Sequence, residues 1–233
     1  MNYIEIKKEL KKLASPEKAI GYERYFKAYE NIHFLGVPVP LQRQIIKTIP
    51  KLELEEISKL LKDKWHECNL IALLMLVKMM KKSKEEKERE KYFNFYCDNF
   101  QYINSWDLVD SSAPGIIGEY LLKKQDRSIL KEFAKSNNIW IQRSAIVSTL
   151  TFIRNNEIDD TFEIAKLLLD KEHDLIHKAV GWLLREAGKK NFEAEYNFLV
   201  ENNRYKTMPR TMLRYAIEKF PEDLRQDFLK NKI

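Results

Sequence analysis

Apolar residues recur at helical spacing along almost the whole chain, and this periodicity limits the fold more than any other feature. The 233 residues include only 6 Gly and 7 Pro, which is little material for the tight turns of an all-β protein. The pattern therefore predicts an all-α fold. A first helix carries Ile4, Leu10 and Leu13, and a second begins at Ser15-Pro16-Glu17. The other predicted helices span about 41–49, 54–62, 65–80, 88–100, 105–122, 128–135, 139–154, 160–170, 175–187, 193–202, 209–220 and 222–229.

The helices also repeat. A cation shortly before a small residue occurs at Arg143, Lys178 and Arg214, at intervals of about 35 residues, and Trp recurs at 65, 106, 140 and 182. A period of about 35–45 residues with two helices per unit is typical of a HEAT-like solenoid. We therefore expect a right-handed α-α superhelix over 1–233, as a single domain without a linker. Equivalent second helices would line one concave surface, and the repeated cations would make it a basic groove.

The charge distribution fits a large anionic partner. The net charge is +6 and the sequence pI is about 9.0. Residues 121–154 alone carry a net charge of +5. A basic groove of this kind suits double-stranded DNA held by its phosphates rather than read by its bases. A HEAT-type scaffold for protein partners is an alternative, and it predicts no steep salt dependence of DNA binding.

Other classes find less support. The apolar run 70–80 is interrupted by Lys78 and is too short to cross a bilayer. Cys68 and Cys97 form no CxxC pair, so buried free thiols in a reducing compartment are expected. His173 and His177 lie four residues apart but lack the H-E-x-x-H glutamate and an obvious third ligand. We expect a cytoplasmic, nucleoid-associated monomer without metal or cofactor.

One segment, Asn104–Gly118, is poorly suited to a core. It places Trp106 and Asp110 four residues apart on one helix face, followed by the small residues of 111–113 and by Pro114-Gly115. A half-buried carboxylate beside an indole suits a site where an anion faces a ligand at short range. The structural alternative is that Asp110 only pairs with a neighbouring cation such as Arg143.

Several motifs in this order resemble the DNA alkylation repair, AlkD-like, HEAT-repeat DNA glycosylases. They are N-S-W-D-L-V-D-S-S-A at 104–113, W-I-Q-R-S-A-I at 140–146, K-A-V-G-W-L-L-R-E at 178–186 and M-P-R-T-M-L-R-Y-A-I-E-K-F at 208–220. The irregular F-L-G-V-P-V-P at 34–40 is similar to the family's N-terminal loop. The resemblance implies excision of N3- and N7-alkylated purines from duplex DNA in base excision repair, by hydrolysis of the N-glycosidic bond without a metal.

The residue chemistry is compatible with that activity. Loss of a cationic base leaves an oxocarbenium-like sugar, and a fixed carboxylate, for which we choose Asp110, stabilises it and positions water. Trp106 and Trp182 offer flat, electron-rich faces to the cationic lesion. Trp182 follows Gly181 inside a strong helix, which suggests the close approach of another surface.

The expected phosphate contacts are cations that follow the repeat. Arg offers a bidentate fork to phosphate. We assign Arg143 and Arg185 as clamps near the lesion, and Lys178, Arg210 and Arg214 as the extension of the stripe. The alternative for each is a solvated cation or an internal ion pair. Tyr25 and the loop at Pro38 are further candidates for DNA contact.

The sequence also bears on mechanism. No segment looks suited to a base-sized pocket or an intercalating plug, so we expect excision without base flipping. No Lys lies within a turn of Asp110 to form a Schiff base, so the enzyme would be a monofunctional glycosylase. The alternative is a non-catalytic HEAT-repeat protein that binds damaged or branched DNA.

Overall fold

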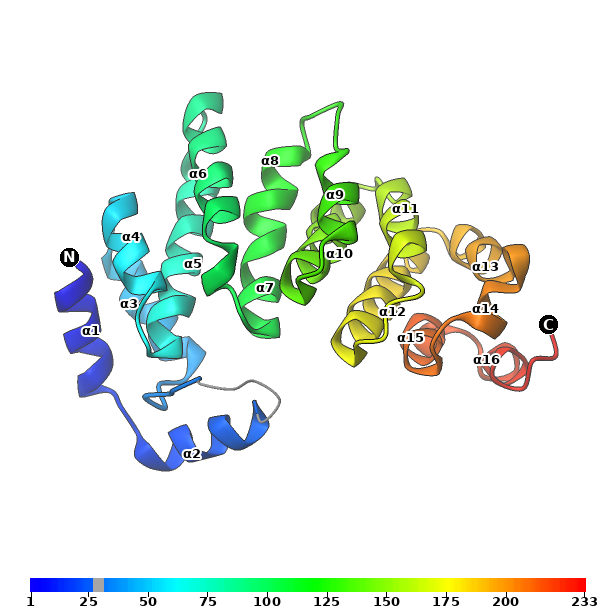
Figure 1. Cartoon of the computed structure of the whole chain (residues 1–233), viewed down its shortest axis with the longest axis horizontal. Helices are drawn as coiled ribbons and strands as arrows, with labels where there is room; N and C mark the ends of the chain where they lie inside the picture. The colour runs from blue at the N-terminus through cyan, green and yellow to red at the C-terminus, as the bar shows by residue number, and fades with distance from the viewer. Residues whose placement is uncertain (27–31) are drawn as a thin grey trace. The chain divides into compact units, whose positions relative to one another are not determined.

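The computed structural model describes residues 1–26 and 32–233, and the regular elements of this part of the chain are all helices (Figure 1). The prediction of an all-α fold is confirmed. Tyr29 and Asn31, which fall in the predicted second helix and in the irregular segment, lie outside the described residues. The chain divides into two compact units, Met1–Ile116 and Ile117–Ile233, and each is described by itself.

The first unit is built around one long helix, α5 (His66–Lys82), which has twelve buried residues. The helices α3, α4, α6 and α7 pack against it, and α1 contacts α3, α4 and α5. Their bounds are α1 Tyr3–Lys12, α2 Pro16–Tyr25, α3 Val39–Thr48, α4 Leu54–Leu61, α6 Glu86–Asp98 and α7 Trp106–Ala113, with a 3-10 turn at Phe100–Tyr102. The apolar run that contains Lys78 is therefore the core helix of this unit.

Lys78 can lie in this mostly buried helix because its ammonium group forms hydrogen bonds within the unit. Its Nζ donates to the Ile46 carbonyl at 2.9 Å and to the Ile49 carbonyl at 2.5 Å. These carbonyls lie at the C-terminal end of α3, where backbone acceptors have no partner within the helix and a cation is favourable. The lysine thus fixes the end of α3 against α5.

The segment before α3 is irregular, as Pro38 and Pro40 predict, and it is held by a buried carboxylate. Glu67 is 1% exposed and accepts backbone N–H bonds from Leu35 at 2.9 Å, Gly36 at 2.8 Å and Val37 at 3.1 Å. Gly36 has φ +80°, and an added Cβ would lie 2.0 Å from the Ser15 carbonyl oxygen. A glycine is therefore required where this loop crosses the start of α2.

The helix predicted over 105–122 is interrupted. Between α7 and the short helix α8 (Glu119–Leu121), residues Pro114–Gly118 form a π-helical turn. Proline lacks the backbone N–H that a continuous α-helix would use, and π-turns within helices accommodate such a break. The two units meet in sequence within this turn.

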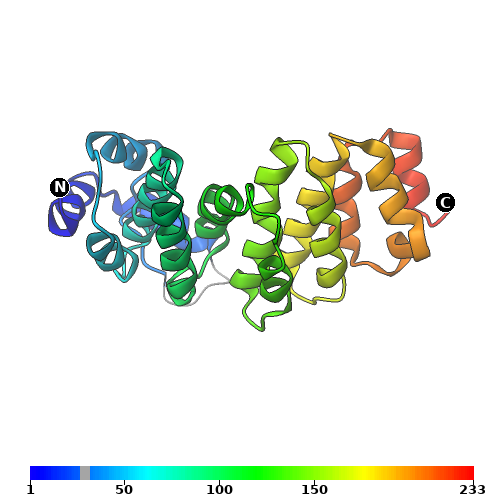
Figure 2. The same cartoon turned by 90° about the horizontal axis from the view of Figure 1, so that it is seen from above.

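The second unit stacks helix pairs. The helices α10, α12 and α15 pack side by side, and α9 and α11 form a second layer against α10 and α12 (Figures 1 and 2). The bounds are α9 Ile129–Lys135, α10 Ile139–Arg154, α11 Asp159–Leu168, α12 Asp174–Gly188, α13 Phe192–Val200, α14 Arg204–Thr207, α15 Arg210–Ala216 and α16 Glu222–Leu229. This stacking of paired helices is the α-α solenoid arrangement that the repeat predicts.

Most helix boundaries agree with the prediction, and α10 and α16 agree at both ends. The densely charged residues 81–91 are divided between the end of α5, at Lys82, and the start of α6, at Glu86. The short α14 was not predicted. None of the helices in the described ranges has the length and apolar character needed to cross a membrane.

Candidate active site

The indole of Trp106, the first residue of α7, lies in a cluster of aromatic side chains. It stacks on Phe26 with ring centroids 5.5 Å apart and planes at 13°, and it meets Tyr25 edge-on at 6.0 Å. Phe26 in turn packs on Phe34 at 5.1 Å and on His66 at 5.4 Å. Trp106 is half-buried, so part of its ring remains available to a ligand.

The helix that supplies this support, α2, has no buried residues. A short helix without a buried apolar face gains little stability from packing. Its C-terminal end is fixed through Phe26, which is 8% exposed, while Tyr25 beside it is 74% exposed. An exposed tyrosine held edge-on against Trp106 supports the suggestion that Tyr25 contacts the ligand.

A buried polar group braces the start of α7. The imidazole Nε2 of His66 lies 2.7 Å from Asp107 Oδ2, and the Ser105 hydroxyl donates to Asp107 Oδ1 at 2.6 Å. His66 is 4% exposed and Ser105 is fully buried. Asp107 also lies in the first helical turn, where negative charge is favourable. This group fixes the helix that carries Trp106 and Asp110.

The small residues after Asp110 serve packing rather than access by a ligand. Ser112 and Ala113 are fully buried, and the Ser112 hydroxyl lies 2.9 Å from the Tyr96 hydroxyl. A Cβ added to Gly115 would lie 2.7 Å from Val77 Cγ1 on α5. The expectation that this segment is poorly suited to a core is therefore wrong for Ser112 and Ala113.

The predicted catalytic residues divide between the two units. Trp106 and half-buried Asp110 lie one turn apart on α7 in the first unit. Trp182 and all five predicted DNA-binding cations lie in the second. The structure therefore brings together Trp106 and Asp110, and separately the residues of α10, α12 and α15. That both groups face one lesion remains a prediction.

Arg143 is used inside the second unit. Its side chain is only 5% exposed, and its Nη1 donates to the Leu175 carbonyl in the first turn of α12 at 2.5 Å. A guanidinium so placed ties α10 to α12. A phosphate would have to reach a largely covered group, and the role of phosphate clamp stays a prediction.

The close approach of another surface at Gly181 is confirmed, and that surface belongs to the protein itself. A Cβ at this position would lie 2.4 Å from the Met212 carbonyl oxygen and 2.5 Å from Tyr215 Cβ. The surface that approaches closely is thus α15 of the same chain. The glycine allows α12 and α15 to pack, and it is no evidence that Trp182 meets a ligand. Trp182 itself is half-buried.

The other predicted DNA-binding cations differ in the ion pairs and hydrogen bonds that they form within the protein. Arg185 pairs with Glu218 and lies 3.6 Å from a Glu186 carboxylate oxygen. Lys178 pairs with Asp174 at 2.6 Å, and Arg210 donates to the Leu229 carbonyl at 2.6 Å. Arg214 is exposed and has no ion pair with any residue the structure describes. The predicted stripe thus consists mostly of cations with internal partners.

A surface cavity of 410 Å³ adjoins Trp182. Its lining residues come from the C-terminal ends of α10 and α12: Leu150, Ile153, Arg154, Trp182, Glu186, Lys189 and Lys190. This volume falls in the usual range of small-molecule sites, roughly 300–1,000 Å³. The cavity is therefore large enough to hold a base, contrary to the expectation that the chain offers no base-sized pocket. Its rim, however, is formed by the exposed cations Arg154, Lys189 and Lys190.

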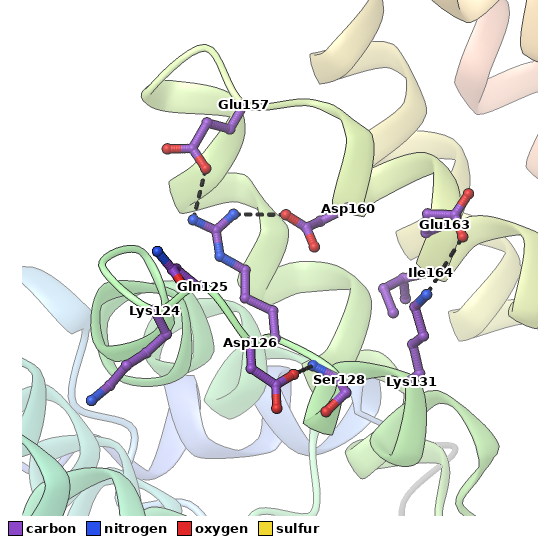
Figure 3. Close-up of a pocket in the computed structure, with 10 residues that line it drawn as sticks. Lys124, Gln125, Asp126, Ser128, Lys131, Glu157, Asp160, Glu163 and Ile164 are labelled. Carbon is purple, nitrogen blue, oxygen red and sulfur yellow. Dashed lines mark hydrogen bonds and ion pairs between the residues drawn. The ribbon is translucent and has the colours of Figure 1, made fainter.

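A second cavity, of 460 Å³, lies where α9 and α11 approach each other (Figure 3). Its charges are neutralised locally: Arg127 pairs with Glu157 and Asp160 at 2.7 Å each, and Lys131 lies 3.6 Å from Glu163. Arg127 also donates to the carbonyls of residues 121 and 122. These pairs stabilise the unit, and they leave no excess positive charge for an anion.

The histidines and cysteines have local roles. His173 is the N-cap of α12 and accepts from the Leu175 N–H at 3.2 Å, and His177 Nε2 lies 2.5 Å from the Lys171 carbonyl. Cys68 is buried, Cys97 is half-buried, and both are free. Burial raises the pKa of both thiols to about 12, so they are poor nucleophiles.

Comparison with known proteins adds the family. The family model of the DNA alkylation repair enzymes matches residues 6–220. The chain belongs to this family. A solved structure described as a predicted DNA alkylation repair enzyme from Enterococcus faecalis has a TM-score of 0.71 and 21% sequence identity, over 90% of this chain and 97% of that chain. At this identity the likeness shows the fold alone. No curated protein matches the chain.

Membership supports a role in the repair of alkylated DNA, with DNA as the partner. Sequence reasoning missed Phe26, His66 and Asp107, which hold Trp106 in place. No spacing rule could find them, because α2, α5 and α7 are far apart in sequence. The one available signal was Asp107, the first acidic residue of the W-D-L-V-D motif.

Proposed function

We propose that the protein is a monofunctional DNA glycosylase that removes N3- and N7-alkylated purines from duplex DNA. The observation that carries this proposal is the braced helix α7, which presents Trp106 and, one turn later, Asp110. An aromatic face and a carboxylate on one rigid helix match what a cationic base and a cationic sugar require.

The proposed reaction is a hydrolysis. The alkylated base leaves C1′ with the electron pair of the glycosidic bond, and its ring charge is thereby neutralised. The positive charge that develops on deoxyribose is stabilised by the Asp110 carboxylate. Water then adds at C1′, and its proton passes to that carboxylate. The products are the free base and an abasic site.

Excision with the base still stacked remains part of the proposal. The cavity at Trp182 is base-sized, but its rim is cationic, and its Glu186 is paired with Lys189 at 2.7 Å. A pocket that reads a flipped base would need unpaired donors and acceptors aimed at the base edge. Selection would instead rest on the charge of the lesion and the weakness of its glycosidic bond.

The test is the identity of the products. Wild-type protein is incubated with a duplex that contains one N7-methylguanine, and the free base is measured by mass spectrometry. We expect free base, with the strand intact until alkali cleaves the abasic site. Strand breaks without alkali would contradict the monofunctional assignment. Tight binding without base release would instead favour the non-catalytic DNA-binding alternative.

A further inference from the structure

The cations around Trp182 are less engaged than the predicted clamps. Arg154, the last residue of α10, is exposed and has no hydrogen bond or ion pair with any residue in the described ranges. Lys190 is exposed, and its Nζ donates to a neutral group, Asn156 Oδ1, at 3.0 Å. Both side chains line the 410 Å³ cavity. Their charges are therefore available to an anion at small cost.

Lys189, the third cation of this rim, has only a weak internal partner. It pairs with Glu186 at 2.7 Å within its own helix end, and its side chain is 44% exposed. Exposed pairs of this kind contribute about 0.2–1 kcal/mol, so a phosphate can replace the carboxylate. Arg143, at 5% exposure, has no comparable freedom.

The positions of these cations along α10 and α12 place them in a second row, beside the row that contains Arg143 and Lys178. Arg154 follows Arg143 by about three helical turns, and Lys189 follows Lys178 by the same interval, so each pair lies on one face of its helix. The rise along each helix is about 16 Å. The same period of about 35 residues that relates Arg143 to Lys178 also relates Arg154 to Lys189. The repeat therefore produces two parallel rows of cations on α10 and α12, which pack side by side.

We infer that Arg154, Lys189 and Lys190 form a second phosphate-binding row for duplex DNA, with Trp182 as the apolar wall between the cations. This inference rests on the proposed function for its ligand. The phosphodiester backbone contacts the guanidinium and the two ammonium groups, and a deoxyribose packs on the indole. Leu150 and Ile153, which are 8% and 2% exposed, form the floor of the cavity.

The inference is tested by the salt dependence of DNA binding. Wild-type protein and the double variant Arg154→Gln/Lys190→Gln are titrated with an undamaged duplex from 50 to 200 mM salt, using fluorescence anisotropy. Two lost phosphate contacts lower the slope of log K against log salt by about 1.8. With equal binding at 1 M salt, this slope corresponds to a loss of about 60-fold in affinity at 0.1 M.

The matched control is Lys131→Gln/Lys166→Gln. These lysines are exposed on α9 and α11, and both pair with Glu163. The variant replaces two cations by neutral side chains, so it changes the net charge by the same amount as Arg154→Gln/Lys190→Gln. We expect it to keep the wild-type slope. The charge-conserving variant Arg154→Lys/Lys190→Arg should also keep it, and circular dichroism checks that all variants fold.

An unchanged slope in the Arg154→Gln/Lys190→Gln variant overturns the inference, and so does an equal loss in the Lys131/Lys166 control. The glycosylase assay separates this result from the proposed function. If the wild type binds DNA but releases no base, and the slope still falls, the second row stands and the glycosylase proposal fails. If the wild type releases base and the slope is unchanged, the second row alone fails.

Discussion

Replacing Glu67 by Gln tests how the aromatic support of Trp106 is held. The carboxylate accepts from the N–H groups of Gly36 and Val37 at Oε1 and of Leu35 at Oε2. A glutamine carbonyl can keep the two bonds at Oε1. Its amide nitrogen would then oppose the Leu35 N–H at the position of Oε2, so one bond is lost and a buried donor is left without an acceptor.

The magnitude follows from these bonds. A hydrogen bond to a charged group contributes about 1.5–3 kcal/mol, and an unsatisfied buried donor costs about 1–3 kcal/mol. We therefore expect Glu67→Gln to lower the free energy of unfolding by about 3 kcal/mol. With a urea m value of about 2 kcal/mol/M, the midpoint falls by roughly 1.5 M. Hydrogen exchange at the amides of residues 35–37 should accelerate.

The variant also has a functional readout. Phe34, next to this loop, packs on Phe26 at 5.1 Å, and Phe26 stacks on Trp106. Release of the loop should therefore lower base excision. The control is Glu23→Gln, the same change at an exposed carboxylate of α2. A wild-type urea midpoint together with protected amides at 35–37 in Glu67→Gln would refute the reasoning.

Two further predictions concern the second unit. Gly181→Ala places a Cβ 2.4 Å from the Met212 carbonyl oxygen, so α12 and α15 must separate, and we expect a loss of about 1–3 kcal/mol in urea unfolding; unchanged stability would contradict the close packing. Glu195 is 2% exposed, and burial raises its pKa to about 9. The folded state thus keeps a proton that the unfolded chain loses above about pH 4.3, and stability falls as pH rises toward 9. Glu195→Gln should therefore be more stable than wild type at pH 8, by at most about 5 kcal/mol (about 1.4 kcal/mol for each pH unit above 4.3), and nearly equal at pH 4; the same difference at both pH values would exclude this cause.

The helices could be predicted because each buried face leaves a local periodic pattern. α10 and α16 have the predicted bounds, since apolar spacing continues into the last turn of each helix. The break at Pro114 could not be placed, because the residues around it keep helical spacing on both sides of the π-turn. The repeat of about 35 residues correctly indicated stacked helix pairs in the second unit.

The site was harder to predict because its support comes from contacts between distant segments. The stack of Phe26 on Trp106 joins α2 to α7, and local spacing carries no signal for it. The burial of Arg143 and the close approach at Gly181 likewise depend on how α10, α12 and α15 pack. Motif spacing could show which residue types the site uses, but it could not show which cations already have partners.

The central claim is that the Asp110 carboxylate stabilises the sugar cation. The most direct measurement is the single-turnover rate of N7-methylguanine release at saturating protein, for wild type and Asp110→Asn. The control is Asp98→Asn, the same change at an exposed carboxylate at the end of α6. The account predicts a loss of about 10²–10³-fold in Asp110→Asn, with duplex affinity and fold unchanged and Asp98→Asn like wild type. Excision by Asp110→Asn at the wild-type rate would contradict it.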